Sequence, residues 1–111
     1  MKTVVDSFTG PYRFLSNFWP CQIHGYASTE HFYQAMKSKD AQYRARIKAA
    51  TSPGVAKRLG RTITLREDWN AIKLDVMLYA LRKKFSEEPL RTMLLSTGDA
   101  KLIEGNTGGV S

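Results

Sequence analysis

Helix start and stop signals divide residues 29–96 into consecutive helical runs, and this limits the chain to an α-rich fold. Ser28 or Thr29 can accept hydrogen bonds from the free amides of a first helical turn. Ser52-Pro53 opens another run, because proline is tolerated at the first helical position, and Gly60 ends it. The predicted helices cover residues 29–38, 40–50, 53–60, 68–85 and 89–96.

The longest of these runs has the clearest apolar periodicity. Asp68 can act as its N-terminal cap. The apolar stripe along it consists of Ile72, Val76, Tyr79, Leu81 and Phe85. We expect this run to be the main buried helix of the protein.

Short β segments flank the helical part. β-Branched content predicts a strand over residues 3–8, an extended run resumes at 12–14, and residues 22–26 suit another brief strand. Residues 101–104 return as a strand, and the glycine-rich residues 105–111 should be mobile. These expectations together describe one α+β domain over residues 1–111, mostly α-helical, with about five helices and a small β component.

Basic residues outnumber acidic ones, 17 Lys and Arg against 10 Asp and Glu, which gives a formal charge of +7. The excess favours anionic partners such as phosphates, nucleotides or nucleic acid, although a basic surface without a specific ligand explains it equally well. Cys21 is the single cysteine, so no intramolecular disulfide can form and a reducing cytoplasm is expected. No signal peptide or membrane span is expected, because no apolar run approaches ~20 residues.

One edge of the first predicted helix carries polar groups at helical spacing. Glu30, Gln34 and Lys37 stand at i, i+4 and i+7, which places an acid, an amide and an amine on one stripe. Such a stripe can line a polar pocket in which the carboxylate activates a water or stabilises a positively charged transition state. A carboxylate in a first turn also suits the helix dipole at a solvent-facing position, so both interpretations stay open.

Other candidate groups are less specific. Trp69 suits stacking on a planar ring, although large aromatic side chains are more often core. Lys57, Arg58 and Arg61 suit either phosphate binding or a solvated helix face. His24 and His31 are the only histidines and lack helical ligand spacing, so no metal and no cofactor are expected.

Several segments together resemble the NADAR family, also described as YbiA-like, over residues 14–104. The matching pieces are Phe14-Leu15-Ser16-Asn17-Phe18-Trp19-Pro20, Thr29-Glu30-His31-Phe32-Tyr33-Gln34-Ala35 with Lys37, Ser52-Pro53-Gly54, Ala56-Lys57-Arg58-Leu59-Gly60-Arg61, Asp68-Trp69, Lys73 with Val76-Met77, Lys84-Phe85, Leu94-Leu95, Thr97-Gly98-Asp99 and Leu102-Ile103-Glu104. The resemblance implies an α-rich domain and an N-glycosidase that cleaves the bond between a ribose carbon and a base nitrogen.

The resemblance also implies roles for single residues. Glu30 would be the catalytic carboxylate, with Lys37 as a partner amine near the ribose or phosphate. Trp69 would form an aromatic wall, and Arg13, Asn17, Gln34 and Arg61 would bind the substrate at the pocket. Substrates similar to those of the family would be ribosylaminopyrimidine phosphates of the early riboflavin pathway, or ADP-ribose attached to guanine in nucleic acid.

One departure from the family pattern affects the expected activity. Family members generally continue with an acidic residue followed shortly by Trp-Gly, and this sequence ends at Ser111 without them. Three outcomes are open: the site works without that segment, a second copy of the chain supplies it, or the protein binds ligand without turning it over. The alternative function is therefore an ADP-ribose, nucleotide or basic nucleic-acid-binding module, in which charge matters and Glu30 does not.

Overall fold

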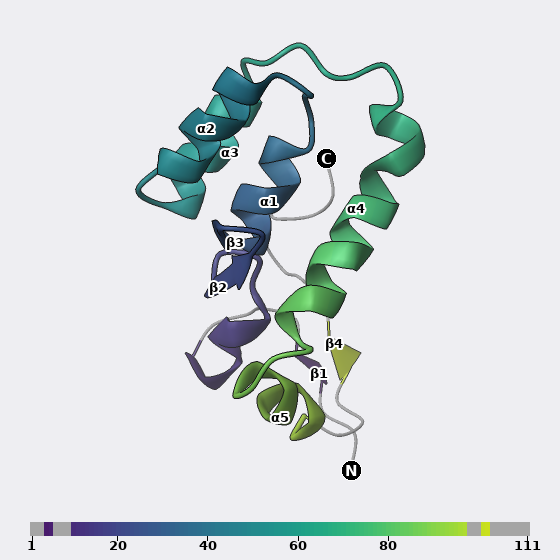
Figure 1. Ribbon diagram of the computed structural model, residues 1–111. Helices are drawn as coiled ribbons and strands as arrows, with labels where there is room; N and C mark the ends of the chain where they lie inside the picture. The colour runs from purple at the N-terminus through teal and green to yellow at the C-terminus, as the bar shows by residue number, and fades with distance from the viewer. Residues whose placement is uncertain (1–3, 6–9, 98–100, 103–111) are drawn as a thin grey trace.

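The computed structural model describes residues 4–5, 10–97 and 101–102, and helices dominate this part of the chain (Figure 1). The helices are η1 (Gly10–Leu15, a 3-10 helix), α1 (Thr29–Ala35), α2 (Ala41–Ala49), α3 (Pro53–Gly60), α4 (Trp69–Lys84) and α5 (Leu90–Leu95). The strands are β1 (Val4–Val5), β2 (Pro20–Ile23), β3 (Tyr26–Ser28) and β4 (Lys101–Leu102). The predicted α+β class with a small β component is confirmed.

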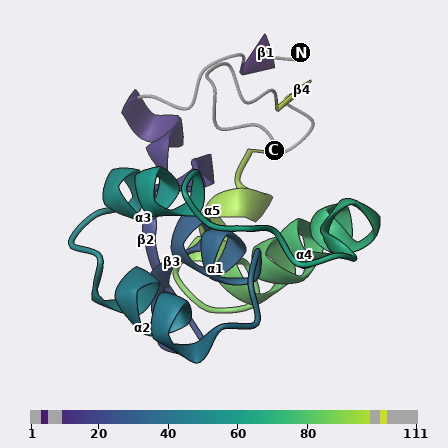
Figure 2. The same cartoon turned by 90° about the horizontal axis from the view of Figure 1, so that it is seen from above.

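Helix α1 lies at the centre of the fold and is buried along its whole length. It contacts α2, α3, α4 and both strands of the β2–β3 hairpin, and Figure 2 shows it enclosed between α2 and α3 on one side and α4 on the other. All seven of its residues are buried, polar ones included. The predicted cap is confirmed at Ser28, whose Oγ accepts a hydrogen bond of 3.0 Å from the amide of His31.

The α2 and α3 helices begin where their capping residues predict. Asp40 accepts a bond of 2.9 Å from the amide of Gln42, and Ser52 accepts one of 3.2 Å from the amide of Val55. Pro53 occupies the first turn of α3, and Gly60 is its last residue. Tyr43 and Ile47 of α2 and Ala56 of α3 pack with Ile23, Tyr26, Phe32, Ala35 and Ala80 in the largest hydrophobic cluster of the described residues.

The prediction that residues 68–85 form the main buried helix is wrong, because α1 occupies that place. Helix α4 packs on α1 by one side only, which leaves Leu74 66% exposed and Leu78 47% exposed. Tyr79 of the predicted apolar stripe is 41% exposed and stacks on the ring of His24. The Asp68 side chain makes no cap bond and instead pairs with Arg66, whose hydrogen bond lowers the pKa of that carboxyl.

The β segments differ from the prediction in two places. Residues 22–26 are not one strand: His24 (φ 50°) and Gly25 (φ 85°) form a left-handed turn that reverses the chain between antiparallel β2 and β3. Residues 12–14 are not extended, because the 3-10 helix η1 includes them; Pro11 has a φ suited to a helical turn.

The terminal strands β1 and β4 pair in parallel, with Val4 opposite Lys101. The remainder of the predicted 3–8 strand, residues 103–104 of the predicted 101–104 strand and the predicted mobile tail 105–111 lie outside the described residues. Among the helices that the structure describes, none combines the length and apolar character needed to cross a membrane.

A buried cation joins the end of α4 to the loop that follows η1. Lys84 is 1% exposed, and its Nζ donates a hydrogen bond of 2.7 Å to the carbonyl of Ser16. The same carbonyl accepts a bond of 3.1 Å from the amide of Trp19. The sequence alone does not show that Lys84 is buried while the neighbouring Arg82 and Lys83 are exposed. This ammonium group therefore fixes the loop that approaches the N-terminus of α1.

The cap of α1 should contribute more to stability than the cap of α3. Ser28→Ala removes a cap bond, about 1 kcal/mol, and leaves the buried Nδ1 of His31, 2.7 Å from Oγ, without its hydroxyl partner, about 1–3 kcal/mol more. Ser52→Ala is the matched control, because it removes a cap bond at a half-buried position only. Urea unfolding measures both changes. Equal losses of unfolding free energy in the two variants would contradict this account.

Candidate active site

The polar stripe predicted from sequence lies on the buried helix α1 and the turn after it. Glu30 is 3% exposed, Gln34 1% and Lys37 7%. Buried polar groups require partners, and the Nε2 of Gln34 donates a hydrogen bond of 2.5 Å to the Oε2 of Glu30. A solvent-facing Glu30 is therefore excluded. The carboxylate instead lies in the interior, with an amide donor one helical turn away.

Like charges surround the ammonium group of Lys37. Burial is the main cause that lowers the pKa of Lys37, and the positive charges of Lys57, Arg61 and Lys73 lower it further. The negative charge of Glu30 acts in the opposite sense and raises it. We call Lys37, Lys57, Arg61 and Lys73 the cationic cluster. Its members come from α3, from α4 and from the residues that follow α1 and α3, and the three partners of Lys37 act on it as like charges.

Tyr33 connects Lys37 with Trp69. The rings of Tyr33 and Trp69 meet edge to face with centroids 5.0 Å apart, and the Nζ of Lys37 lies 5.8 Å from the centroid of the Tyr33 ring. Trp69 is 2% exposed and packs with Tyr33 and Met77, so its ring is a core group in this structure. Tyr33 was not among the predicted site residues, although it follows Glu30 by three positions on the same helix and therefore lies near it.

Asn17 attaches the loop after η1 to the first turn of α1. Its carbonyl oxygen accepts hydrogen bonds from the amide of Glu30 (3.1 Å) and from the Oγ1 of Thr29 (3.0 Å). The Oδ1 of Asn17 accepts a further bond of 3.1 Å from the same hydroxyl. Asn17 thus fixes the backbone that carries Glu30. This is a structural role, and the predicted substrate-binding role of Asn17 stays a prediction.

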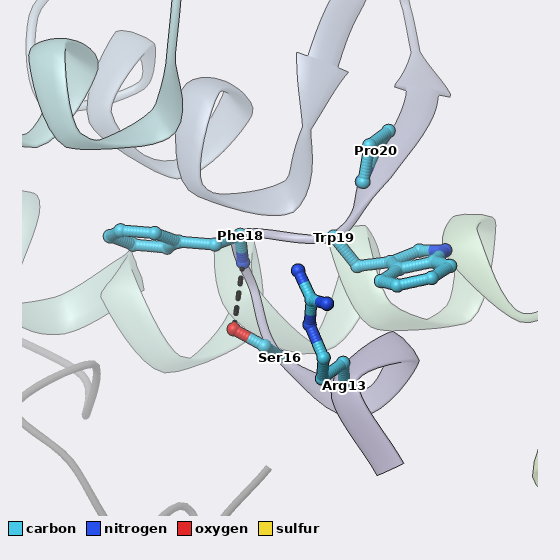
Figure 3. Close-up of a pocket in the computed structure, with 5 residues that line it drawn as sticks. All are labelled: Arg13, Ser16, Phe18, Trp19 and Pro20. Atoms are coloured by element: carbon cyan, nitrogen blue, oxygen red, sulfur yellow. Dashed lines mark hydrogen bonds between the residues drawn. The ribbon is translucent and has the colours of Figure 1, made fainter. Parts of the chain in front are cut away.

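Arg13 was predicted to bind the substrate beside Glu30, and the structure places it in a pocket that Glu30 does not line. It lines a pocket of about 450 Å³ with Ser16, Phe18, Trp19 and Pro20, and Glu30 is not among the lining residues. Figure 3 shows the Arg13 side chain directed toward the space between the Phe18 and Trp19 rings. Phe18 is 40% exposed. The structure therefore links Glu30 with Gln34 by a hydrogen bond, and Glu30 and Arg61 with Lys37 by electrostatic interaction, whereas Arg13 lines a pocket without these residues.

The histidines are engaged in the fold. His31 is 2% exposed; its Nε2 lies 3.1 Å from the carbonyl of Ala50, which requires a proton on Nε2 and leaves Nδ1 to accept from Ser28. The Nε2 of His24 pairs with the hydroxyl of Tyr79. Within residues 4–5, 10–97 and 101–102, no group of three or more His, Cys, Asp or Glu residues could hold a metal ion.

Known proteins with similar sequences place this arrangement in a family. The chain is 42% identical over 105 residues to the N-glycosidase YbiA of Escherichia coli, covering 88% of this chain and 66% of the relative. It is 43% identical over 106 residues to an N-glycosidase of Nostoc punctiforme (86% and 68%) and 39% identical over 98 residues to a riboflavin biosynthesis protein of Vibrio vulnificus (82% and 27%). The chain spans about two thirds of the length of the N-glycosidases it matches.

The fold agrees with that comparison. The NMR structure of Escherichia coli YbiA superposes with a TM-score of 0.78 at 39% identity, covering 94% of this chain and 68% of that one. The profile of the NADAR domain matches residues 6–108, which is nearly the whole sequence. The chain belongs to the NADAR domain family.

Proposed function

We propose that this protein is an N-glycosidase that hydrolyses the bond between a ribose carbon and a base nitrogen, with Glu30 as the catalytic carboxylate. The observation that carries the proposal is the buried carboxylate of Glu30, bonded to Gln34 and electrostatically coupled to Lys37 on the central helix. The names of the Escherichia coli and Nostoc relatives support the reaction class.

The reaction needs groups of opposite charge at one place. As the glycosidic bond breaks, positive charge develops on the sugar carbon, which a fixed carboxylate stabilises while it orients the attacking water. The water oxygen bonds to the sugar carbon while the Glu30 carboxylate takes up one of the water protons. The bond between the sugar carbon and the base nitrogen breaks, its electron pair stays on the nitrogen, and the nitrogen takes up a proton. Lys37 is suited to donate that proton, because its lowered pKa makes the ammonium group a stronger acid than an exposed lysine.

The cationic cluster favours a phosphorylated substrate. Lys57, Arg61 and Lys73 all act on Lys37 as like charges, and a phosphate or diphosphate on the ribose would offset this positive charge. A ribosylaminopyrimidine phosphate fits this requirement, and the Vibrio relative is named a riboflavin biosynthesis protein. ADP-ribose attached to guanine in nucleic acid fits it also, and the formal charge of +7 favours both anions.

The proposed location is the cytoplasm.

A binding module is the second candidate function, and the pocket around Arg13 favours it. A guanidinium group beside the exposed ring of Phe18 suits a nucleobase with its phosphate, and this surface does not include Glu30. In that case nucleotide binding depends on Arg13 and Phe18, weakens steeply with added salt, and survives the loss of Glu30.

Glu30→Gln should abolish base release. The variant keeps the side-chain shape and still accepts from Gln34, so its melting temperature should stay close to that of the unchanged protein. Its kcat should fall by about 100-fold or more, because the negative charge and the basic group are lost together. Mass spectrometry of base release from a ribosylaminopyrimidine phosphate and from ADP-ribosylated DNA measures this. Asp75→Asn, an exposed carboxylate on α4, is the control. An undiminished rate in Glu30→Gln would refute the proposal.

Neighbouring charges should move the titration of Lys37 in opposite directions. Its pKa should lie below the ordinary 10.5, rise when Arg61→Met removes a like charge, and fall further when Glu30→Gln removes the opposite charge. NMR of the lysine Cε resonances measures these shifts, with the exposed Arg82→Met as control. The lowered pKa means that Lys37 binds its proton more tightly in the unfolded chain than in the folded protein. The protonated ammonium group therefore destabilises the folded state, and this destabilisation disappears as the pH rises from the folded pKa to 10.5. Titration of Lys37 at or above 10.5 would contradict the account.

A further inference from the structure

Gln34 presents its two polar atoms to very different surroundings. Its Nε2 donates to Glu30, whereas its Oε1 is a buried acceptor without a hydrogen-bond partner among the described residues. An ionised carboxylate only accepts hydrogen bonds, so the NH₂ group must face Glu30 and the oxygen must face away. This orientation leaves a buried carbonyl unpaired, which costs free energy and calls for an explanation.

The explanation lies in α3, at Gly60. A Cβ atom placed on Gly60 would stand 1.9 Å from the Oε1 of Gln34 and 2.8 Å from its Cδ, closer than any real contact. The amide oxygen of Gln34 therefore lies directly against the Gly60 backbone, where a Cα hydrogen is a weak donor. Tyr43 fixes the other end of the residue, since its hydroxyl donates a bond of 2.7 Å to the backbone carbonyl of Gln34.

Backbone conformation does not demand a glycine here. Gly60 is the last residue of α3 and does not have a left-handed φ. Alanine is the better helix former at a position of this kind. The absence of a side chain at Gly60 is thus explained by the close approach of α3 to the Gln34 amide. Because Gln34 is 1% exposed, its amide cannot turn out into solvent without displacing the residues that cover it.

We infer that Gly60 and Gln34 are positioning residues, and that the bare backbone of Gly60 keeps the Gln34 amide in the orientation that fixes the Glu30 carboxylate. This inference rests on the proposed function of Glu30. A side chain at Gly60 displaces the amide, and the carboxylate then loses the hydrogen bond that holds it in line with the scissile bond. The displaced Gln34 amide also no longer donates a hydrogen bond to the ionised carboxylate.

Gly60→Ala tests the inference, with Gly54→Ala as the matched control in the same helix. A Cβ on Gly54 would meet only the Oγ of Ser52 at 3.8 Å, an ordinary contact. Using a ribosylaminopyrimidine phosphate, we expect kcat of Gly60→Ala to fall about 100-fold, as expected for a small misplacement of a reacting group, with KM little changed. The acid limb of its pH profile should move to higher pH, and the side-chain amide resonances of Gln34 should shift. Gly54→Ala should change none of these.

The double variant shows whether Gly60 acts through Gln34. Gln34→Ala alone should lower kcat, and adding Gly60→Ala to it should cause no further loss, because the displaced group is already absent. An unchanged kcat in Gly60→Ala, or the same factor of loss in both Gln34 backgrounds, would overturn the inference. If Gly60→Ala does not fold, Gln34→Ala decides: undiminished kcat in that variant overturns the inference. An undiminished kcat in Glu30→Gln would instead refute the proposed function itself.

Discussion

The burial of helix α1 is the constraint on which the rest of the structure depends. A central helix usually carries apolar residues, yet this one carries Glu30, His31 and Gln34 at positions with almost no solvent access. Each polar group must be satisfied from within the protein, since an unpaired one would cost much of the stability of a domain of this size. The surrounding elements are arranged to supply those partners.

The partners outside α1 come from β3, from α2 and from the loop after η1. The β3 strand supplies the hydroxyl of Ser28 to His31, and the end of α2 supplies the carbonyl of Ala50. The loop after η1 bonds to the amide of Glu30 through Asn17, and α2 holds the carbonyl of Gln34 through Tyr43. The Glu30 side chain instead accepts a hydrogen bond from Gln34, a neighbour within α1 itself. That dependence makes its orientation sensitive to how closely α3 packs.

Local signals in the sequence were sufficient for most helices but not for their burial. Ser28, Ser52-Pro53 and Gly60 define helix ends through hydrogen bonds and backbone geometry that involve only near neighbours, so these ends were predictable. Which helix lies inside is a tertiary property. The apolar stripe of α4 is more regular than that of α1, yet α4 is covered on one side only. The turn at His24 and Gly25 was missed because a histidine with positive φ is uncommon.

Part of the candidate site was also predictable from local signals in the sequence. Helical spacing predicts that Glu30, Gln34 and Lys37 lie on one edge, and all three are buried, with Lys37 in the turn after α1. Gln34 bonds to Glu30 as that spacing suggests. The approach of α3 to Gln34 involves residues far apart in sequence, so the sequence predicted for Gly60 only that it ends a helix. Arg13 could not be placed because the path of the loop after η1 depends on the buried ammonium of Lys84.

The central claim is that the buried carboxylate of α1 is where the ribose reacts. A crystal structure of the protein with ribose phosphate bound tests it most directly. The account predicts a Glu30 carboxylate oxygen within hydrogen-bond distance of the anomeric hydroxyl and the phosphate among Lys37, Lys57, Arg61 and Lys73. A sugar bound instead in the pocket of Arg13, Phe18 and Trp19, with Glu30 out of contact, would contradict it.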